Sequence, residues 1–199
     1  RTSHPIAGAV GRNVLADGGK AIDAAVAVGY AVAVVHPVAG NIGGGGFAVI
    51  QLADGTSTVC DFRERAPLKT TRDMYLDANG DVVPGLSTDT YLAAGTPGTV
   101  AGMSAILERY GTRKLADLMA PAIFLAGAGF RISDRQEDSL AEYVDLMKKF
   151  ASTRRYFLKP DGSPYKSGDI FIQEDLAKTR KRIAVQGPSE FYKGETALL

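Results

Sequence analysis

The chain has 199 residues, 45% of them hydrophobic and 23% charged, a composition typical of globular protein. Its 23 basic and 22 acidic residues nearly cancel, so charge gives no reason to expect binding to nucleic acid or to an anionic membrane. A single cysteine, Cys60, excludes an internal disulfide, and no apolar stretch reaches the roughly 18–20 residues of a membrane span.

Two helices are predicted before the first strand. Apolar residues recur with a helical period over Ile6–Asp17, and Gly18-Gly19 follows as a stop. Ala21–Val35 forms a second helix that is apolar on nearly every face and that Pro37 ends. We expect this helix to need more sheet than the chain supplies, and part of it to face water in the chain alone.

Four consecutive glycines, Gly43–Gly46, follow the second helix and lead into a strand. Because ordering glycines is costly, we expect either positive φ angles or a close backbone approach that leaves no room for a Cβ. The order helix, loop, strand is the reverse of a phosphate-binding P-loop. A tightly packed connection is therefore favoured over a ligand loop.

A β-hairpin is predicted next, because Phe47–Leu52 and Thr56–Phe62 flank the turn signal Asp54-Gly55. Four further helices are predicted, at about 100–110, 115–127, 133–150 and 175–185, with a short strand at 152–159. Pro121 predicts a kink or a division in the helix at 115–127.

Two further signals concern helix ends. Ser133 and Gln136 have the spacing of a capping box that opens the helix at 133–150. The basic cluster Lys178–Arg182 is expected near the end of its helix, where cations favour the helix dipole. A solvated helix end is favoured over a binding patch.

Few side chains could carry catalysis by themselves. The two histidines are His4, expected to be exposed, and His36, expected at a helix end, and neither has a plausible partner for a Ser-His-Asp arrangement. Two histidines and one cysteine give no zinc-type spacing, and no calcium loop is recognisable. Cys60 lies in an apolar run and is interpreted as a small buried hydrophobe.

Arg63 is the one candidate binding residue. It directly follows the second strand of the hairpin and is flanked by Glu64 and Arg65. Arginine can hold a carboxylate with two parallel hydrogen bonds, but a strand-end salt bridge to Glu64 or to another acid would need no ligand. The local pattern alone favours the salt bridge.

Five motifs in fixed order resemble γ-glutamyltranspeptidase, and specifically the large subunit of the bacterial periplasmic enzymes. They are GKAIDAAVA at 19–27, PVAGNIGGGGF at 37–47, DFRERAP at 61–67, GTPGTVAG at 95–102 and GPSEFY at 187–192. The likeness runs from Ile6 to Leu199. Several motifs in one order are a more specific signal than any one of them alone.

The resemblance implies an α/β (α+β) fold, part of the αββα sandwich of an N-terminal-nucleophile hydrolase. Residues 1–199 would be the N-terminal portion of the large subunit, mostly helical with one β-hairpin, completed by sequence or a subunit absent here. Such enzymes cleave their own precursor into a heterodimer, so the implied partner is the small, catalytic subunit. A periplasmic or secreted location is implied, although no signal peptide is visible, and no cofactor or metal is expected.

The implied activity is that of a γ-glutamyltransferase and glutathione hydrolase. A small-subunit threonine, which Thr2 does not match, attacks the γ-amide of glutathione or another γ-glutamyl compound. The γ-glutamyl-enzyme then passes its acyl group to water, an amino acid or a peptide. No catalytic residue lies in this chain, and Arg63 alone carries over, as the contact to the substrate's α-carboxylate.

Two other interpretations stay open. A cephalosporin or glutaryl acylase, or a poly-γ-glutamate depolymerase, would keep the same machinery and would also suit Arg63. A non-catalytic helical scaffold domain would use the motifs for structure only. A second chain that begins with Thr and co-purifies would separate the enzymes from the scaffold.

Overall fold

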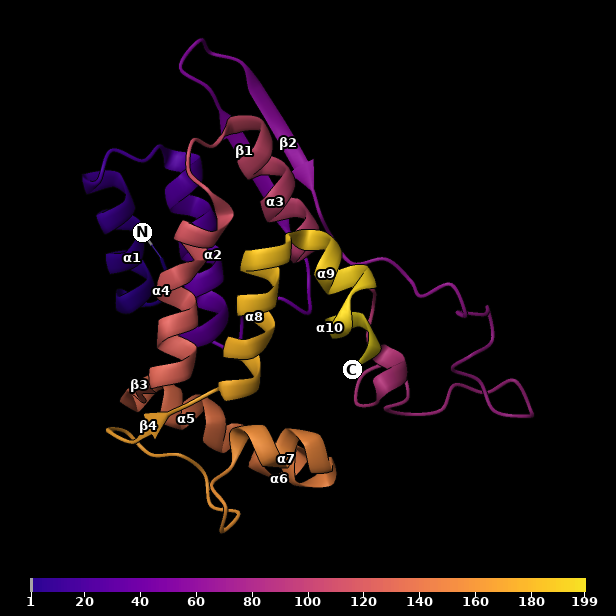
Figure 1. Ribbon diagram of the computed structural model, residues 1–199. Helices are drawn as coiled ribbons and strands as arrows, with labels where there is room; N and C mark the ends of the chain where they lie inside the picture. The colour runs from indigo at the N-terminus through magenta and orange to yellow at the C-terminus, as the bar shows by residue number, and fades with distance from the viewer. Residues whose placement is uncertain (1) are drawn as a thin grey trace. The chain divides into compact units, whose positions relative to one another are not determined.

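The computed structural model describes residues 2–199, which form two compact units (Figure 1). The larger unit runs to Asn41 and resumes at Met103, and the smaller unit consists of Ile42–Gly102. The larger unit is mostly helical, and the smaller one carries the β-hairpin. The prediction of a mostly helical chain with one hairpin is therefore confirmed.

The larger unit is built around α2 (Ala21–Val35), nine of whose 15 residues are buried. Figure 1 shows α4 (Leu115–Ala128) beside it, and α1 (Pro5–Ala16) also packs against it. α1 and α2 can approach closely because Gly11 of α1 has no side chain. A Cβ at that position would lie only 2.5 Å from a methyl group of Val28 in α2.

Helices of the chain itself therefore cover α2. The expectation that it needs more sheet, and would otherwise face water, is wrong for most of its surface. Among the residues of α2, only Ala21 and Ala25 are exposed. Pro121 lies inside α4, which nevertheless forms one continuous helix rather than two.

A buried carboxylate joins the start of α2 to the loop after α3 (Thr99–Tyr110). Asp23 accepts hydrogen bonds from the backbone N–H groups of Lys20, Thr112 and Arg113, at 2.8, 2.7 and 3.0 Å, and from the Thr112 hydroxyl at 2.7 Å. Burial raises the pKa of Asp23, but these hydrogen bonds outweigh it and lower the pKa to about 2. The carboxylate is thus held ionised at neutral pH.

The basic cluster Lys178–Arg182 lies in the middle of α8 (Glu174–Gln186) rather than at its end. Arg180 is fully buried, and its Nη1 donates to the carbonyl oxygen of Tyr30 at 2.6 Å. Arg182 pairs with the buried Glu190 at 3.1 Å. The expectation of a solvated helix end is therefore wrong, because α8 continues for another turn and its neighbours cover these two arginines.

Two short helices close the chain after α8. They are α9 (Pro188–Lys193), which carries Glu190, and α10 (Glu195–Leu198). The backbone N–H of Thr196 donates to the Glu190 carboxylate at 3.0 Å. Glu190 therefore ties the end of the chain to α8.

The predicted capping box of Ser133 and Gln136 is present and opens α5 (Asp134–Glu142). Gln136 also donates through Nε2 to the carbonyl oxygen of Val35, at 2.6 Å, and so joins α5 to the end of α2. The helix expected at 133–150 is interrupted, since α6 (Val144–Lys149) follows as a separate element.

The short strand expected at 152–159 is instead α7 (Ala151–Phe157). Arg155 and Tyr156 both contact the carboxylate of Asp175 in α8, at 3.3 and 3.0 Å. Long-range contacts thus override the strand preference of the aromatic residues. A small antiparallel ladder that the sequence did not predict pairs β3 (Phe130–Arg131) with β4 (Ile170–Phe171).

The smaller unit contains the predicted hairpin. β1 (Phe47–Gln51) pairs antiparallel with β2 (Ser57–Asp61). Gly55 in the turn has a φ of 86°, which favours glycine. Most of the rest of this unit is loop and turn, with one 3-10 helix, η1 (Tyr91–Ala93). Within residues 2–199 the hairpin is a two-stranded sheet, so both of its outer edges are unpaired.

Candidate functional site

Arg63 lies two residues beyond the end of β2. Its backbone N–H donates to the Asp61 carboxylate at 3.0 Å. Its guanidinium carbon lies 5.9 Å from the ring centroid of Phe47, the residue paired with Asp61 across the hairpin. The side chain is exposed, and no ion pair joins it to Glu64 or to any other acid in the described chain. The salt bridge favoured by the local pattern is therefore not formed.

Phe62 anchors the backbone beside Arg63. Its N–H donates to the carbonyl oxygen of Gly46 at 2.9 Å, and the Gly46 N–H returns a longer bond of 3.4 Å. The side chain packs against Gly46 and against Gly102 in the first turn of α3, where a Cβ would collide with the ring. The hairpin ladder is thus extended by one residue pair toward Arg63.

The glycine run passes against the same backbone. A Cβ on Gly45 would lie 2.5 Å from the Phe62 oxygen, 2.7 Å from the Arg63 Cα and 2.8 Å from the Glu64 nitrogen. None of Gly43–Gly46 has a positive φ. Close approach, the second of the two expected reasons, therefore applies at Gly45 and, against the Phe62 ring, at Gly46, whereas a Cβ on Gly43 would meet nothing within 4 Å. The tightly packed connection is thus confirmed for the second half of the run.

The turn before α3 is a second segment that contacts the backbone around Arg63. The carbonyl oxygen of Gly44 accepts hydrogen bonds from Gly98 and Thr99, at 2.8 and 3.0 Å. Arg65 and Thr96 exchange two backbone hydrogen bonds, of 3.1 and 2.7 Å. The backbone that carries Arg63 is thus fixed between two segments, while its guanidinium stays free to bind an anion, the arrangement that a precise binding residue needs.

One face of the hairpin is apolar and exposed. Phe47, Val49 and Val59 are 59%, 80% and 64% exposed, and Val49 pairs with Val59. On the other face Ile50 is buried and Cys60 is half-buried, so the interpretation of Cys60 as a buried hydrophobe holds only in part. Arg63 therefore follows a strand whose apolar face has no cover within residues 2–199.

The two histidines occupy one end of the larger unit. His4 is buried, its Nδ1 accepts the N–H of Ile6 at 3.3 Å at the start of α1, and its ring meets Phe130 edge-on at 6.2 Å. The expectation that His4 is exposed is wrong, because its ring packs against Phe130 of the same unit. His36 lies at the C-terminal end of α2, as expected.

No group of three or more His, Cys, Asp or Glu side chains in residues 2–199 is placed to hold a metal ion. None of the helices within these residues has the length and apolar character to cross a bilayer.

The chain is similar to known proteins over nearly its whole length. Residues 7–199 match the family model Gamma-glutamyltranspeptidase. The glutathione hydrolase proenzyme of Pseudomonas sp. strain A14 is 51% identical over 197 residues, which are 98% of this chain and 34% of that protein. The proenzyme of the same name from Escherichia coli K12 is 49% identical over 94% of this chain and 32% of its own length. The chain thus spans about a third of these relatives.

The same similarity is found among solved structures. The crystal structure of Helicobacter pylori γ-glutamyltranspeptidase matches with a TM-score of 0.98 and 56% identity, over 100% of this chain and 57% of that one. This match confirms the expected fold, a mostly helical part of an N-terminal-nucleophile hydrolase. The role of Arg63 as a substrate contact stays a prediction.

Proposed function

Because this chain belongs to the γ-glutamyltranspeptidase family, we propose that it is the N-terminal portion of a large subunit that helps to cleave γ-glutamyl amides. The complete protein would be a γ-glutamyltransferase and glutathione hydrolase. The similarity to two glutathione hydrolase proenzymes, at 51% and 49% identity, carries this proposal.

The partner that we propose is a small subunit cut from the same precursor. Its N-terminal threonine would attack the γ-amide of glutathione or of another γ-glutamyl compound, with its own amine as base. Water, an amino acid or a peptide would then take up the γ-glutamyl group. The word proenzyme in the names of both relatives supports such processing. A periplasmic or secreted location belongs to the same proposal.

Arg63 would hold the α-carboxylate of the γ-glutamyl group. An exposed guanidinium without an ion pair, on a backbone fixed by Gly45 and Gly98, supports this role. A carboxylate would gain two parallel hydrogen bonds from the guanidinium fork. The binding energy would position the γ-amide for attack, since orientation of the reacting group lowers the barrier.

The proposal can be tested on the complete, processed protein with a chromogenic γ-glutamyl anilide. We expect release of the chromophore, and a faster release when a dipeptide acceptor is added. A glutaryl anilide keeps the carboxylate and lacks the α-amine, so it serves as the matched substrate. Cleavage of the glutaryl anilide alone would favour an acylase, and cleavage of neither compound would favour the scaffold interpretation.

A further inference from the structure

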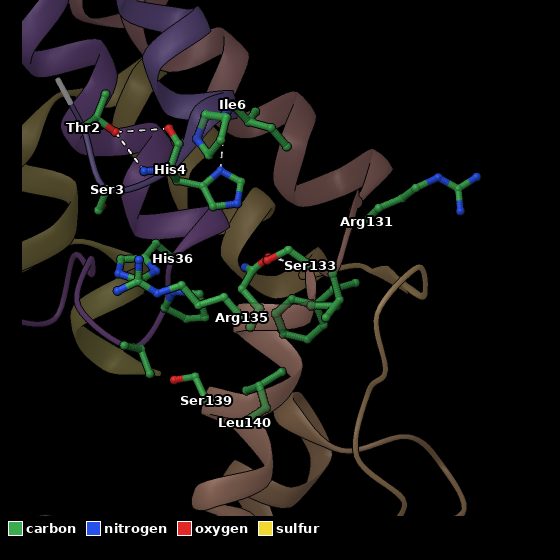
Figure 2. A pocket seen from close by; sticks show the side chains of 16 residues that line it. Thr2, Ser3, His4, Ile6, His36, Arg131, Ser133, Arg135, Ser139 and Leu140 are labelled. Carbon is green, nitrogen blue, oxygen red and sulfur yellow. Dashed lines mark hydrogen bonds between the residues drawn. The ribbon is translucent and has the colours of Figure 1, made fainter.

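A cavity of about 660 Å³ opens at the end of the larger unit that carries both histidines (Figure 2). It is formed by residues 2–4 and the start of α1, the end of α2, and the segment from β3 into α5. Its size lies within the range of small-molecule pockets, about 300–1,000 Å³. The cavity is separate from the site at Arg63, since neither Arg63 nor the hairpin lines it.

The charges around the cavity have one sign. Its lining includes His4, His36, Arg131 and Arg135 but no Asp or Glu side chain. The nearby acid Glu137 is not part of the lining, and its carboxylate accepts the N–H of Ser167 at 2.7 Å. The cavity is therefore suited to an anion and not to a cation.

Two of the four basic side chains are already engaged. The Arg131 guanidinium donates to the carbonyl oxygen of Gly168 at 2.9 Å, and Figure 2 shows it pointing away from the other lining residues. His4 accepts the N–H of Ile6. Burial lowers the pKa of His4, a hydrogen bond with Gln136 partly opposes this, and the ring is thus a neutral part of the wall.

The other two are free to bind. No hydrogen bond or ion pair within residues 2–199 engages the side chain of Arg135 or the ring of His36, and both lie at the cavity (Figure 2). Ile6, Leu140 and Phe171 supply apolar walls. A ligand that fits both the free basic side chains and the apolar walls carries one anionic group and an apolar body.

We infer that this cavity binds a small amphipathic carboxylate. Arg135 holds the carboxylate through its planar guanidinium, and His36 donates a second hydrogen bond to it. The apolar part of the ligand packs on Ile6, Leu140 and Phe171. A compact polyanion such as phosphate would leave these apolar walls uncovered. The inference does not depend on the proposed γ-glutamyl chemistry.

The test is the binding of octanoate to the complete protein, measured by isothermal titration calorimetry. Octan-1-ol and octylamine are matched probes that keep the apolar chain and remove or reverse the charge. We expect octanoate to bind and octylamine not to bind. Equal affinities for octanoate and octan-1-ol, or no binding of octanoate at millimolar concentration, would overturn the inference.

Two variants locate the carboxylate. Arg135→Gln should weaken octanoate binding roughly ten- to a hundredfold, because it removes one charge-assisted contact. Arg131→Gln removes the same charge from a side chain that points away, and should leave the affinity unchanged. Both arginines are exposed, so both variants should stay folded, and Arg131→Gln alone loses a bond, the one to the Gly168 oxygen. Equal weakening by the two variants would show a general charge effect and would overturn the assignment.

Discussion

A Cβ on Gly45 would lie 2.7 Å from the Cα of Arg63, so the glycine run and the arginine share one tightly packed contact. The φ of Gly45 is not positive, and the requirement for glycine is therefore one of space alone. The contact connects two of the motifs seen in the sequence. It also makes the position of the arginine depend on a residue that is not expected to touch substrate.

Gly45→Ala should therefore displace the backbone at Arg63. We expect the complete enzyme to lose about 1–3 kcal/mol of stability, typical of an overpacked site, and KM for a γ-glutamyl anilide to rise. Gly43→Ala is the matched control, because no atom lies within 4 Å of a Cβ at that position. Identical melting temperatures and KM values for the two variants would refute the packing account.

The ionised Asp23 makes stability depend on pH in the acid range. The pKa is about 2 in the folded chain, below the ordinary value of 3.8. The stabilisation is therefore fully present above pH 3.8 and is lost as the pH falls toward 2, by about 2 kcal/mol in total.

Asp23→Asn should remove this part of the pH dependence. We expect its melting temperature to lie below that of the wild type at pH 6, and the difference to shrink as the pH approaches 2. Asp138→Asn, which removes an exposed acid from α5, controls for the loss of one carboxylate. If the melting temperatures of Asp23→Asn and the wild type differed by the same amount from pH 6 to pH 2, Asp23 would not be the source of this pH dependence.

The contact between α8 and the end of the chain depends on Glu190. Its carboxylate is almost fully buried and accepts from Arg182, at 3.1 Å, and from Thr196. Glu190→Gln leaves the charge of Arg182 without its buried partner, a change that costs about 3–5 kcal/mol for a fully buried pair. We expect the loss of stability in Glu190→Gln to lie toward the lower end of this range, because the Arg182 side chain is 17% exposed.

Glu195→Gln is the matched control in the same network. Glu195 lies 3.3 Å from Arg182, but its side chain is 64% exposed, and such pairs contribute about 0–1 kcal/mol. Chemical denaturation of both variants would measure the contrast. If Glu195→Gln destabilised the protein as much as Glu190→Gln, burial would not be what makes the first pair important.

Residues 1–199 produced alone should have no hydrolase or transferase activity and should expose the hairpin. The sequence offers no plausible nucleophile–base pair, and within residues 2–199 the face with Phe47, Val49 and Val59 is uncovered. We expect binding of a hydrophobic dye, reduced in Val49→Thr. A monomer that melts cooperatively without binding dye would instead favour an independent domain. Cleavage of the anilide by this chain alone would contradict the proposal that the nucleophile lies in a separate small subunit.

Local patterns predicted the elements well, because capping, period and turn chemistry act over a few residues. Ser133 and Gln136 form the expected capping box, and Asp54-Gly55 forms the expected turn. Contacts between distant residues were not predictable in this way. The burial of Arg180 depends on Tyr30, which lies 150 residues earlier in the chain.

The same limit applies to the candidate site. Tight packing of the glycine run was expected and is found at Gly45 and Gly46, but the partner Phe62 and the second close contact, at Gly98, could be seen only in the structure. The local pattern at Arg63 favoured a salt bridge to Glu64 that the described chain does not contain. Only the resemblance to a family pointed to a carboxylate ligand instead.

The most direct test of the account is the KM of Arg63→Lys in the complete enzyme with a γ-glutamyl anilide. Lysine keeps the charge and loses the bidentate fork. Since a charge-assisted contact is worth about 1.5–3 kcal/mol, we predict that KM rises roughly ten- to a hundredfold. Arg65→Lys, the same change two residues away, should leave KM unaltered. A KM for Arg63→Lys equal to that of the wild type would contradict the assignment of Arg63 to the substrate carboxylate.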